Sequence, residues 1–348
     1  MTLYYSTFVS GFQDLIPRVL ARRLPGAVIR QVLDGAVLYE APADRQMITS
    51  LRCFNNSFAV LRTQAGSWDG LSQFVRTLSS DAELPRLVRE HLSPGRHGFR
   101  VVVSRENQLV PLPESLLQPL EKRLARGSGL YPNRGRPQVE FWLLFRREGL
   151  FLFLLRLTRQ AAGEARLEPG ELRPELANLL CELSDPDATD VFLDPFCGSG
   201  SIPLERASLA PYRLIFAQDT DPGRVKALRQ RVKGLRKPAQ RTFFAKQVDA
   251  RSMEGFDDSF VDKVVTDPPW GLYEALEERP ADLHREALAE CVRVLRPNGL
   301  LVWLTARDDE LEAVVKEAVE GFVVEERYPI LVSGRKASVY RLRKRPHE

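Results

Sequence analysis

The sequence predicts an α/β protein in which an open, mostly parallel sheet with a terminal antiparallel hairpin follows an α+β N-terminal half. Three observations support this class. Short apolar runs alternate with helix-like spacing across residues 171–348, two of those runs end in turns rich in glycine or proline, and the N-terminal half repeats a strand-helix-strand-strand order. With 348 residues, of which 44% are hydrophobic, the chain is long enough to bury two cores.

The N-terminal half contains the strand-helix-strand-strand pattern twice. The first copy comprises strands at 3–8, 28–33 and 35–40 with a helix at 15–24, and the second comprises strands at 99–106, 139–145 and 150–157 with a helix at 116–124. Each copy is half of a ferredoxin-like unit. Phe141 and Trp142 lie on a predicted strand, where packing in the core is favoured over stacking on bases.

A polar, glycine-bearing stretch then separates the two halves. Residues 159–170 are predicted to form a linker. Leu172, Arg173 and Pro174 follow, and proline at this place suits the first turn of a helix.

The first motif with chemical content follows the apolar run 190–193. It consists of Asp194, Pro195, Phe196, Cys197, Gly198, Ser199 and Gly200, and a helix is predicted from about residue 202. Glycines in a turn between strand and helix let the backbone approach a ligand closely. The spacing fits neither the dinucleotide fingerprint nor the Walker pattern, so a smaller nucleoside such as S-adenosylmethionine fits better than a pyrophosphate. An ordinary loop is the alternative, and Cys197 is interpreted as a small residue in a tight turn.

Two further strands should bring acids to the same edge of the sheet. The strand predicted at 213–218 ends at Asp219 and Asp221, about twenty residues past the glycines, where a ribose-binding acid belongs. Asp219 is the first choice, and the alternative for this turn is to cap the next helix. The run 243–248 leads to Asp249, which either accepts the adenine amino group or caps a turn.

The second motif is Asp267, Pro268, Pro269 and Trp270, which follows the predicted strand 261–266. The prolines fix the backbone, so that the Asp267 carboxylate and the Pro268 carbonyl become stiffly held acceptors. Such acceptors can bind the N–H groups of a conjugated exocyclic amine and direct its lone pair at a methyl sulfonium, while Trp270 stacks on the base. The target base would leave its stack to enter this pocket. Alone, Asp-Pro-Pro would be an ordinary turn, and its order after the glycine motif favours function.

The remaining elements complete the sheet. A helix at 282–295 is stopped by Arg-Pro-Asn-Gly at 296–299, a buried strand covers 300–304, and strands at 323–332 and 338–343 form a closing hairpin. A hairpin at the edge of an otherwise parallel sheet is what class I methyltransferases show. Residues from about 165 onward therefore resemble this Rossmann-like domain.

Charge and cysteine usage narrow the function classes. Residues 1–170 hold 23 Lys and Arg against 15 Asp and Glu, whereas residues 171–348 hold 27 against 31. The net positive charge of residues 1–170 favours a nucleic-acid partner, although the preference for arginine over lysine also reflects genome composition or habitat. The four cysteines lack metal or disulfide spacing, so no metal is expected. No signal peptide is recognised and the longest apolar stretch, 150–155, is far too short for a membrane span, so we expect a soluble, cytoplasmic protein that makes no membrane contact.

The N-terminal half resembles a ferredoxin-like domain followed by a THUMP domain, the RNA-binding front end of several tRNA-modifying enzymes. The predicted domains are then 1–64 (ferredoxin-like), 65–158 (THUMP), 159–170 (linker) and 171–348 (methyltransferase). Candidate phosphate contacts are Arg134, Arg136, Arg146 and Arg147, with a solvated strand edge as the alternative.

The whole chain resembles the THUMP-containing tRNA guanine-N2 methyltransferases. This resemblance implies S-adenosylmethionine as methyl donor and a guanosine in tRNA as acceptor, with the acceptor stem expected from the family, and we expect a monomer. Trp270 keeps the aromatic role of the family motif, in which tyrosine or phenylalanine is commoner. Asp267 instead of asparagine leaves adenine-N6 or cytosine-N4 chemistry open. An rRNA or DNA amino-methyltransferase and a nonenzymatic RNA-binding protein remain alternatives.

The candidate site is therefore defined as follows. The amine-binding residues are Asp267, Pro268, Pro269 and Trp270, and the cofactor-binding residues are Arg173, Pro174, Asp194, Pro195, Phe196, Cys197, Gly198, Ser199, Gly200, Asp219 and Asp249. The resemblance places Arg173 and Pro174 beside the cofactor.

Overall fold

The computed structural model describes residues 1–158, 171–271, 279–306, 309–317 and 321–346. The chain divides into two compact units. The first unit comprises Met1–Phe8 and Ile16–Ala162, and the second comprises Val9–Leu15 and Gly163–Glu348. The predicted linker, 159–170, lies outside the described residues.

The first unit is built on one continuous mixed sheet, which has nine strands among the described residues in the order β2-β3-β1-β4-β9-β8-β5-β6, with β7 paired to β5. The strands are β1 (Thr2–Thr7), β2 (Val28–Leu33), β3 (Ala36–Ala41), β4 (Asn56–Ala65), β5 (His97–Arg105), β6 (Gln108–Leu109), β7 (Leu130–Pro132), β8 (Val139–Arg146) and β9 (Leu150–Arg156). Both predicted strand-helix-strand-strand patterns are present.

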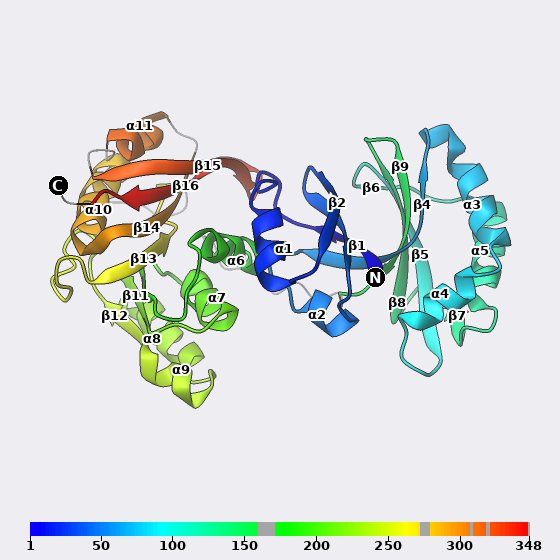
Figure 1. Ribbon diagram of the computed structural model, residues 1–348, viewed down its shortest axis with the longest axis horizontal. Helices are drawn as coiled ribbons and strands as arrows, with labels where there is room; N and C mark the ends of the chain where they lie inside the picture. Colours follow the sequence, from blue (N-terminus) through cyan, green and yellow to red (C-terminus); the bar gives the residue numbers. More distant parts are fainter. Residues whose placement is uncertain (159–170, 272–278, 307–308, 318–320, 347–348) are drawn as a thin grey trace. The chain divides into compact units, whose positions relative to one another are not determined.

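Helices of the first unit pack on this sheet. They are α1 (Ile16–Arg23), α2 (Arg45–Thr49), the 3-10 turn η1 (Trp68–Gly70), α3 (Leu71–Ser80), α4 (Leu84–Glu90) and α5 (Glu114–Ala125). Helices α3, α4 and α5 lie together on one side of β4, β5, β8 and β9 (Figure 1). Phe141 is fully buried and stacks on Phe153, and Trp142 packs edge-on against Phe58. The expected core role of Phe141 and Trp142 is confirmed.

Strand β4 joins the two predicted subdomains of the first unit. It pairs with β1 on one side and with β9 on the other, both antiparallel. The predicted boundary at residue 64 falls at the end of this strand, and the division into 1–64 and 65–158 stays a prediction.

The second unit contains a seven-stranded sheet within its described residues, in the order β12-β11-β10-β13-β14-β16-β15. Its strands are β10 (Val191–Asp194), β11 (Leu214–Asp219), β12 (Phe243–Gln247), β13 (Val261–Thr266), β14 (Leu295–Ala306), β15 (Phe322–Val332) and β16 (Arg335–Lys344), and its helices are α6 (Pro174–Leu183), α7 (Ser201–Leu209), α8 (Pro222–Val232), α9 (Lys237–Thr242), α10 (Pro280–Val294) and α11 (Asp309–Glu317). The first five strands of that order run parallel, and β16 pairs antiparallel with both β14 and β15.

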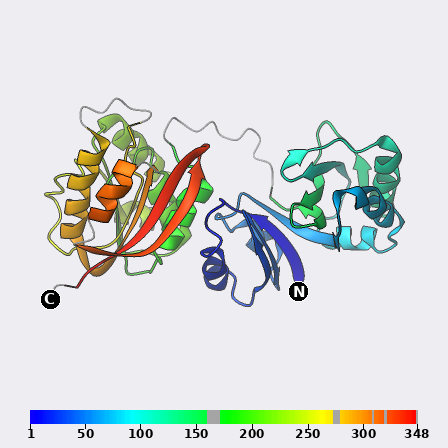
Figure 2. The same ribbon diagram turned by 90° about the horizontal axis from the view of Figure 1, so that it is seen from above.

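Helices cover both faces of this sheet. Helices α10 and α11 (gold and orange) lie on one face, and the green helices α6 and α7 lie on the other (Figure 2). Side chains of α10 and α11 form one hydrophobic core with β10, β13 and β14. The hairpin turns through Ser333 and Gly334, both at positive φ, which suits a two-residue turn. The predicted α/β class with a terminal hairpin is confirmed.

One strand differs from its predicted extent. We predicted that residues 296–299 end a helix and that a strand begins at 300, but β14 already begins at Leu295. Leu295 pairs with Val261 and Leu300 with Lys263, so the intervening residues bulge out of the ladder. Asn298 takes a positive φ of 65° within this bulge, which explains why the segment reads as a turn in the sequence.

No helix among the described residues is long and apolar enough to cross a membrane.

Candidate active site

The predicted site residues meet at the carboxyl edge of the second unit's sheet. Strand β10 pairs with β11 on one side and with β13 on the other, so the chain order reverses beside β10. Ligands of open α/β sheets bind outside the carboxyl ends of the strands at such a reversal. Asp194 ends β10, Asp219 ends β11 and Asp267 directly follows β13. The topology therefore brings three acids from distant parts of the sequence to one edge.

The cofactor loop, Asp194–Gly200, depends on its two glycines. Gly198 and Gly200 have φ values of +51° and +90°, a region that favours glycine. A Cβ on Gly200 would lie 2.3 Å from a methyl carbon of Leu228 on α8, whereas a Cβ on Gly198 would meet nothing within 4 Å. One glycine is thus required for packing against α8, and the other leaves open space beside the backbone for a ligand.

Asp219 holds this loop in place. Its Oδ2 accepts a hydrogen bond from the backbone N–H of Gly198 at 2.9 Å, and its Oδ1 accepts one from the backbone N–H of Asp221 at 2.9 Å. Each oxygen retains a further lone pair for a ribose hydroxyl. Asp221 instead caps α8, because its carboxylate accepts from the N–H groups of Gly223 and Arg224. The capping alternative thus applies to Asp221, and Asp219 remains the better ribose candidate.

Asp194 is a buried acceptor that the protein only partly satisfies. Its Oδ1 accepts hydrogen bonds from the hydroxyl of Thr266 at 2.7 Å and from the N–H of Phe196 at 3.2 Å. Its Oδ2 is buried and has no partner among the described residues. Burial raises the pKa of Asp194 to about 7, although these hydrogen bonds act in the opposite direction. An unsatisfied buried acceptor of this kind is expected where a ligand donates.

The Asp-Pro-Pro-Trp motif shows the same property. The Oδ1 of Asp267 and the indole Nε1 of Trp270 are buried, and neither has a hydrogen-bond partner of standard geometry within the described residues. Burial, and then the negative charge of Asp194, raise the pKa of Asp267 well above its ordinary value, while the Trp270 indole lowers it by less. Pro268 is buried and Pro269 half-buried. The indole N–H thus lies near the carboxylate without forming a hydrogen bond of standard geometry, and the motif presents a buried acceptor beside a buried donor.

Two buried side chains that we did not predict hold this motif from both sides. Thr266, the residue before Asp267, donates its hydroxyl to Asp194 of the cofactor loop, as described above. His284 on α10 is fully buried, and its Nε2 lies 3.1 Å from the carbonyl oxygen of Pro269. Burial lowers the pKa of His284 to about 4, so the ring is neutral at physiological pH and Nε2–H donates to that carbonyl.

The signal for His284 was present in the sequence. The residue lies in the apolar stripe of its helix, at the spacing of Ala281, Leu288 and Cys291, and a polar residue at a core position needs a partner. The sequence signal for Thr266 is weaker, because threonine is common in strands. Gln218, next to Asp219, was also missed, and its buried Oε1 has no partner among the described residues.

The other predicted cofactor residues lie along the loop and at the start of α6. Cys197 is buried, and burial raises the pKa of its thiol, which fits a small filler of a tight turn. Ser199 donates a hydrogen bond from its hydroxyl to Glu171 at 3.1 Å, which brings the start of α6 next to the loop. Arg173 is the exposed N-cap of α6 and Pro174 is its first residue. Pro195 is buried and Phe196 half-buried.

Asp249 has local partners that match the turn alternative. Its Oδ1 accepts from the backbone N–H of Arg251 at 2.9 Å, and its carboxylate pairs with the Arg251 guanidinium at 2.6 Å. Hydrogen bonding to Arg251 lowers the pKa of Asp249. Its assignment to the adenine amino group stays a prediction.

The predicted RNA contacts in the first unit differ in how available they are. Arg134 pairs with Glu114 at 2.8 Å and with Glu121 at 3.4 Å. Arg147 pairs with Asp34 at 3.2 Å. Arg146 is only 8% exposed and is held by Glu148, by the Tyr5 hydroxyl and by the carbonyl of Asp34.

Of the four arginines, Arg136 is exposed and its side chain has no ion pair in the described part of the chain. It is therefore the one whose guanidinium is available without breaking a pair.

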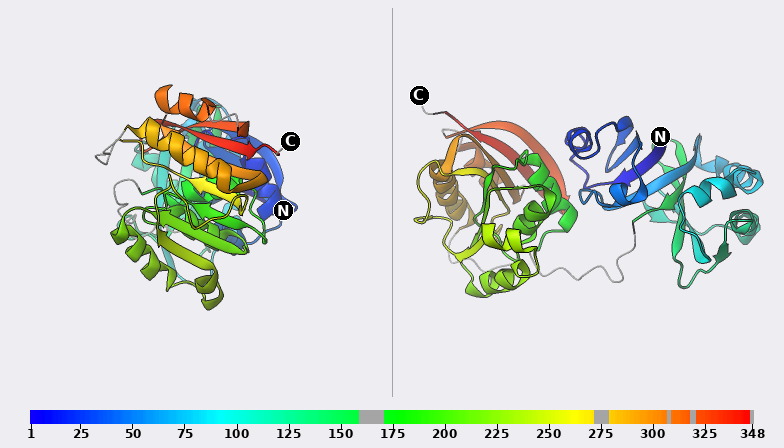
Figure 3. Two further views of the ribbon diagram at one scale, coloured as in Figure 1. Left: turned by 90° about the vertical axis from the view of Figure 1, so that its left-hand side faces the viewer. Right: turned by 60° about the horizontal axis from the view of Figure 1, so that its bottom comes forward.

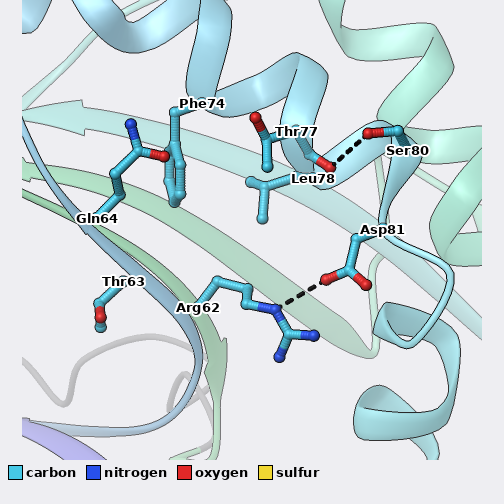
Figure 4. A pocket seen from close by; sticks show the side chains of 8 residues that line it. All are labelled: Arg62, Thr63, Gln64, Phe74, Thr77, Leu78, Ser80 and Asp81. Atoms are coloured by element: carbon cyan, nitrogen blue, oxygen red, sulfur yellow. Dashed lines mark hydrogen bonds and ion pairs between the residues drawn. The ribbon is translucent and has the colours of Figure 1, made fainter.

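A hollow of about 390 Å³ lies in the first unit, and none of its lining residues is a predicted cofactor residue (Figure 4). It is lined by Arg62, Thr63, Gln64, Phe74, Thr77, Leu78, Ser80 and Asp81. Its charged groups pair with each other, with Arg62 and Asp81 2.8 Å apart, and the Ser80 hydroxyl donates to backbone carbonyls of its own helix. The charged side chains of this hollow therefore already have partners. Within the described residues, no cluster of three or more His, Cys, Asp or Glu side chains is arranged to hold a metal.

The residues at the carboxyl edge fit S-adenosylmethionine. One edge of the sheet carries the glycine turn with open space at Gly198, the candidate ribose acceptor Asp219, and Asp194 with its unsatisfied oxygen. The Asp267–Trp270 motif follows the adjacent strand. A nucleoside carrying a methyl sulfonium has the hydroxyls and the amino group that these acceptors require.

Comparisons with known proteins agree with this geometry. Residues 164–330 match the family described as UPF0020: RMKL-like, methyltransferase domain. The crystal structure of TrmN from Thermus thermophilus superposes with a TM-score of 0.74 at 25% sequence identity, over 99% of this chain and 100% of that one. The matched family is described as a methyltransferase domain, and the superposition confirms the predicted fold; the predicted cofactor, S-adenosylmethionine, agrees with both.

Two relatives by sequence are named for activity on tRNA. The tRNA (guanine(6)-N2)-methyltransferase of Thermus thermophilus is 31% identical over 217 residues, which cover 61% of this chain and 63% of that protein. The tRNA (guanine(10)-N2)-dimethyltransferase of Methanothermobacter thermautotrophicus is 34% identical over 161 residues, which cover 46% of this chain and 45% of that protein. The alignments thus span less than two thirds of either relative. The resemblance to tRNA guanine-N2 methyltransferases is confirmed.

Proposed function

We propose that this protein transfers a methyl group from S-adenosylmethionine to the exocyclic N2 amine of a guanosine in tRNA. The observation that carries the proposal is the meeting of the cofactor loop with the Asp267–Trp270 motif at one sheet edge, where Asp194 and Asp267 both keep a buried acceptor without a partner among the described residues. Relatives named as tRNA guanine-N2 methyltransferases support the choice of guanine and of tRNA.

The motif would activate the amine mainly by orienting it. The Asp267 carboxylate and the Pro268 carbonyl accept the two N–H groups, which aims the nitrogen lone pair away from them, and Trp270 stacks on the base. When bound, S-adenosylmethionine supplies an electrophilic methyl group on sulfur. The amine nitrogen would take this methyl group, sulfur would leave as the uncharged thioether, and the amine would give up one proton. The raised pKa of Asp267 makes its carboxylate a suitable acceptor for this proton.

The cofactor is held, in this proposal, by the loop backbone and by acids of the neighbouring strands. Asp219 binds the ribose hydroxyls, and Asp194 accepts from the amino group of the methionine portion. The contact of Glu171 with Ser199 supports a place for Arg173 and Pro174 beside the cofactor. Arg251 donates to both carboxylate oxygens of Asp249, so Asp249 would accept from the adenine amino group only with a remaining lone pair.

The first unit would bind the RNA, with residues 65–158 as a THUMP domain behind a ferredoxin-like domain at 1–64. Arg136 is the strongest of the predicted phosphate contacts because it forms no ion pair among the described residues. The acceptor stem is the proposed region of the tRNA. A substrate of this kind supports the cytoplasm as the place of action.

The proposal is tested by transfer of labelled methyl from S-adenosylmethionine to unmodified bulk tRNA, with rRNA and duplex DNA in parallel, followed by nucleoside mass spectrometry. N2-methylguanosine in tRNA alone is the expected product. Methylated adenine, or label only in rRNA or DNA, would support the assignment of the methyl-transfer site but would contradict guanosine in tRNA as the substrate. No label in any substrate would favour a nonenzymatic RNA-binding protein.

The role of the motif is tested by Asp267→Ala. We expect turnover to fall by at least about a thousandfold, because the orienting acceptor and the proton acceptor are lost together. Calorimetry should give a cofactor Kd close to that of the wild type. Retained turnover with weakened cofactor binding would move Asp267 from the amine to the cofactor.

A further inference from the structure

Residues 222–248 form the most one-sided stretch of charge in the second unit. They hold nine Lys and Arg and no Asp or Glu. The remaining residues of 171–348 hold 18 Lys and Arg against 31 Asp and Glu. We call residues 222–248 the basic segment. The segment also contains four of the nine lysines of the whole chain, so its cations are not part of a uniform excess.

The basic segment folds into one continuous part of the second unit. Helix α8, helix α9 and strand β12 follow one another in the chain, and both helices contact β12. Figure 3 shows α8 and α9 (yellow-green) at one edge of this unit's sheet. Because β12 is the edge strand, this surface is formed by the segment itself.

Most cations of the segment are exposed and unpaired. Three arginines serve the fold: Arg224 lies 4.0 Å from Asp221, Arg229 donates to the carbonyl of Ala245, and Arg231 donates to the carbonyl of Ser199. The other six are exposed and form no ion pair among the described residues; they are Lys226, Lys233, Arg236, Lys237, Arg241 and Lys246.

The segment is anchored to the cofactor loop. Arg231 reaches the Ser199 carbonyl at 2.6 Å, and Leu228 fills the space that a side chain on Gly200 would occupy. A polyanion held along α8 would therefore extend toward the edge of the sheet at which the methyl-transfer residues lie.

We propose that the basic segment binds the phosphodiester backbone of the substrate RNA and forms a second RNA contact in addition to the first unit. This inference rests on the proposed function for the identity of the substrate. Six unpaired cations with no acid between them match a chain of phosphates, and flexible lysines suit contacts that carry no sequence information.

The side chains of the segment favour RNA over a membrane or a protein as the partner. A membrane-binding helix would present an apolar face, but Val225, Leu228 and Val232 of α8 are all buried in the unit. Protein interfaces are depleted in lysine and enriched in aromatic anchors. In the segment, Phe244 is the single large hydrophobic residue that is exposed among those described, and it stacks on Phe216 of the neighbouring strand.

The test compares two triple variants of the full chain that remove the same charge. One carries Lys226→Gln, Lys233→Gln and Lys237→Gln in the segment, and the control carries Arg213→Gln, Lys316→Gln and Lys336→Gln at exposed positions of the second unit. Fluorescence anisotropy measures binding to an unmodified tRNA transcript, without cofactor, at several salt concentrations. Glutamine removes the charge but remains polar, and its helix propensity is close to that of lysine at the helical positions.

We expect the segment triple to weaken tRNA binding by at least about tenfold at low salt. The slope of log affinity against log salt should fall by roughly 2 to 3, because each lost phosphate contact removes about 0.7 to 0.9 of the slope. The control triple should change Kd by less than about threefold. The cofactor Kd of the segment triple should equal that of the wild type, which would show that the fold is intact.

An unchanged Kd and slope in the segment triple would overturn the inference, and so would an equal loss in the control triple. If the segment triple lost the binding of the wild type to phosphatidylserine vesicles but kept its tRNA affinity, the segment would be a membrane-binding surface instead. The proposed function fails separately, since it is rejected when wild-type protein transfers no methyl to tRNA, whereas this comparison reads RNA binding alone.

Discussion

The two units of the molecule differ in which buried groups lack a hydrogen-bond partner. In the first unit, which carries the basic excess, the buried side-chain atoms without a hydrogen bond are single nitrogens of arginines that make other contacts, and several arginines are paired with acids. Glu140 is 8% exposed and accepts from Arg100 and Arg156, and Arg134 and Arg147 have acidic partners on the surface. In the second unit, which is net acidic, the buried Asp194, Asp267 and His284 each keep a polar atom without a partner among the described residues.

The difference teaches that unsatisfied groups locate function better than net charge does. Paired charges in the first unit contribute to its own fold, and pairing limits what they can offer a ligand. Groups left without a partner are costly to maintain in a folded protein, so their gathering at one sheet edge indicates where a ligand completes the structure.

The largest expected effect belongs to the carboxyl of Asp194, which has partners on one oxygen only. Its pKa of about 7 in the folded state lies above the ordinary value near 3.9, so the folded protein keeps a proton that the unfolded chain has released. The stabilising contribution of this group is complete below about pH 4 and is lost as pH rises through 7. The loss amounts to roughly 2–4 kcal/mol.

Urea unfolding at pH 5 and pH 8 measures this effect. The wild type should lose more stability between these pH values than Asp194→Asn, whose amide oxygen can still accept from Thr266 and Phe196. The same pH dependence in both proteins would mean that Asp194 is already ionised in the folded state.

The next effect concerns His284, which is satisfied on one nitrogen only. His284→Leu removes the donor to the Pro269 carbonyl, and we expect kcat to fall about 10- to 100-fold with the cofactor Kd unchanged. His284→Gln offers an N–H at a similar place and should recover most of that loss. Equal defects in the leucine and glutamine variants would show a purely structural role.

The smallest effect is expected from the paired arginines of the first unit. Arg134→Gln combined with Arg147→Gln should raise the tRNA Kd by less than about threefold, because both guanidinium groups already have acidic partners. Arg136→Gln alone should raise it more. A double variant that binds tRNA more weakly than the lysine triple of the basic segment would reverse the contrast between the units.

Most of the second unit could be predicted from the sequence, because its strands are short apolar runs that end in motifs of distinctive composition. Asp194, Asp219 and Asp267 meet as expected, since parallel strands place their carboxyl ends at one edge. The sequence alone does not show that the Asp221 carboxylate caps α8, a contact that favours Asp219 over Asp221 for the ribose.

Other features depend on contacts that no local pattern reveals. Strand β4 was not predicted because its first half is largely buried and its second half alternates, so it has no single periodicity. Helices α3 and α4 were not predicted either. The pairing of Arg134 and Arg147, the burial of Arg146, and the contact of His284 with Pro269 all depend on residues that are far apart in the chain or on different elements.

The hydrogen bond between Thr266 and Asp194 joins residues 72 positions apart, and this separation has a consequence for how the protein folds. Long-range parallel pairings form slowly because a large loop must close before they gain any contact energy, whereas the hairpin through Ser333 and Gly334 closes locally. During synthesis the glycine turn emerges well before its partner strand. The candidate site is therefore assembled late, only after β13 has docked beside β10, and a partly made chain carries no complete site.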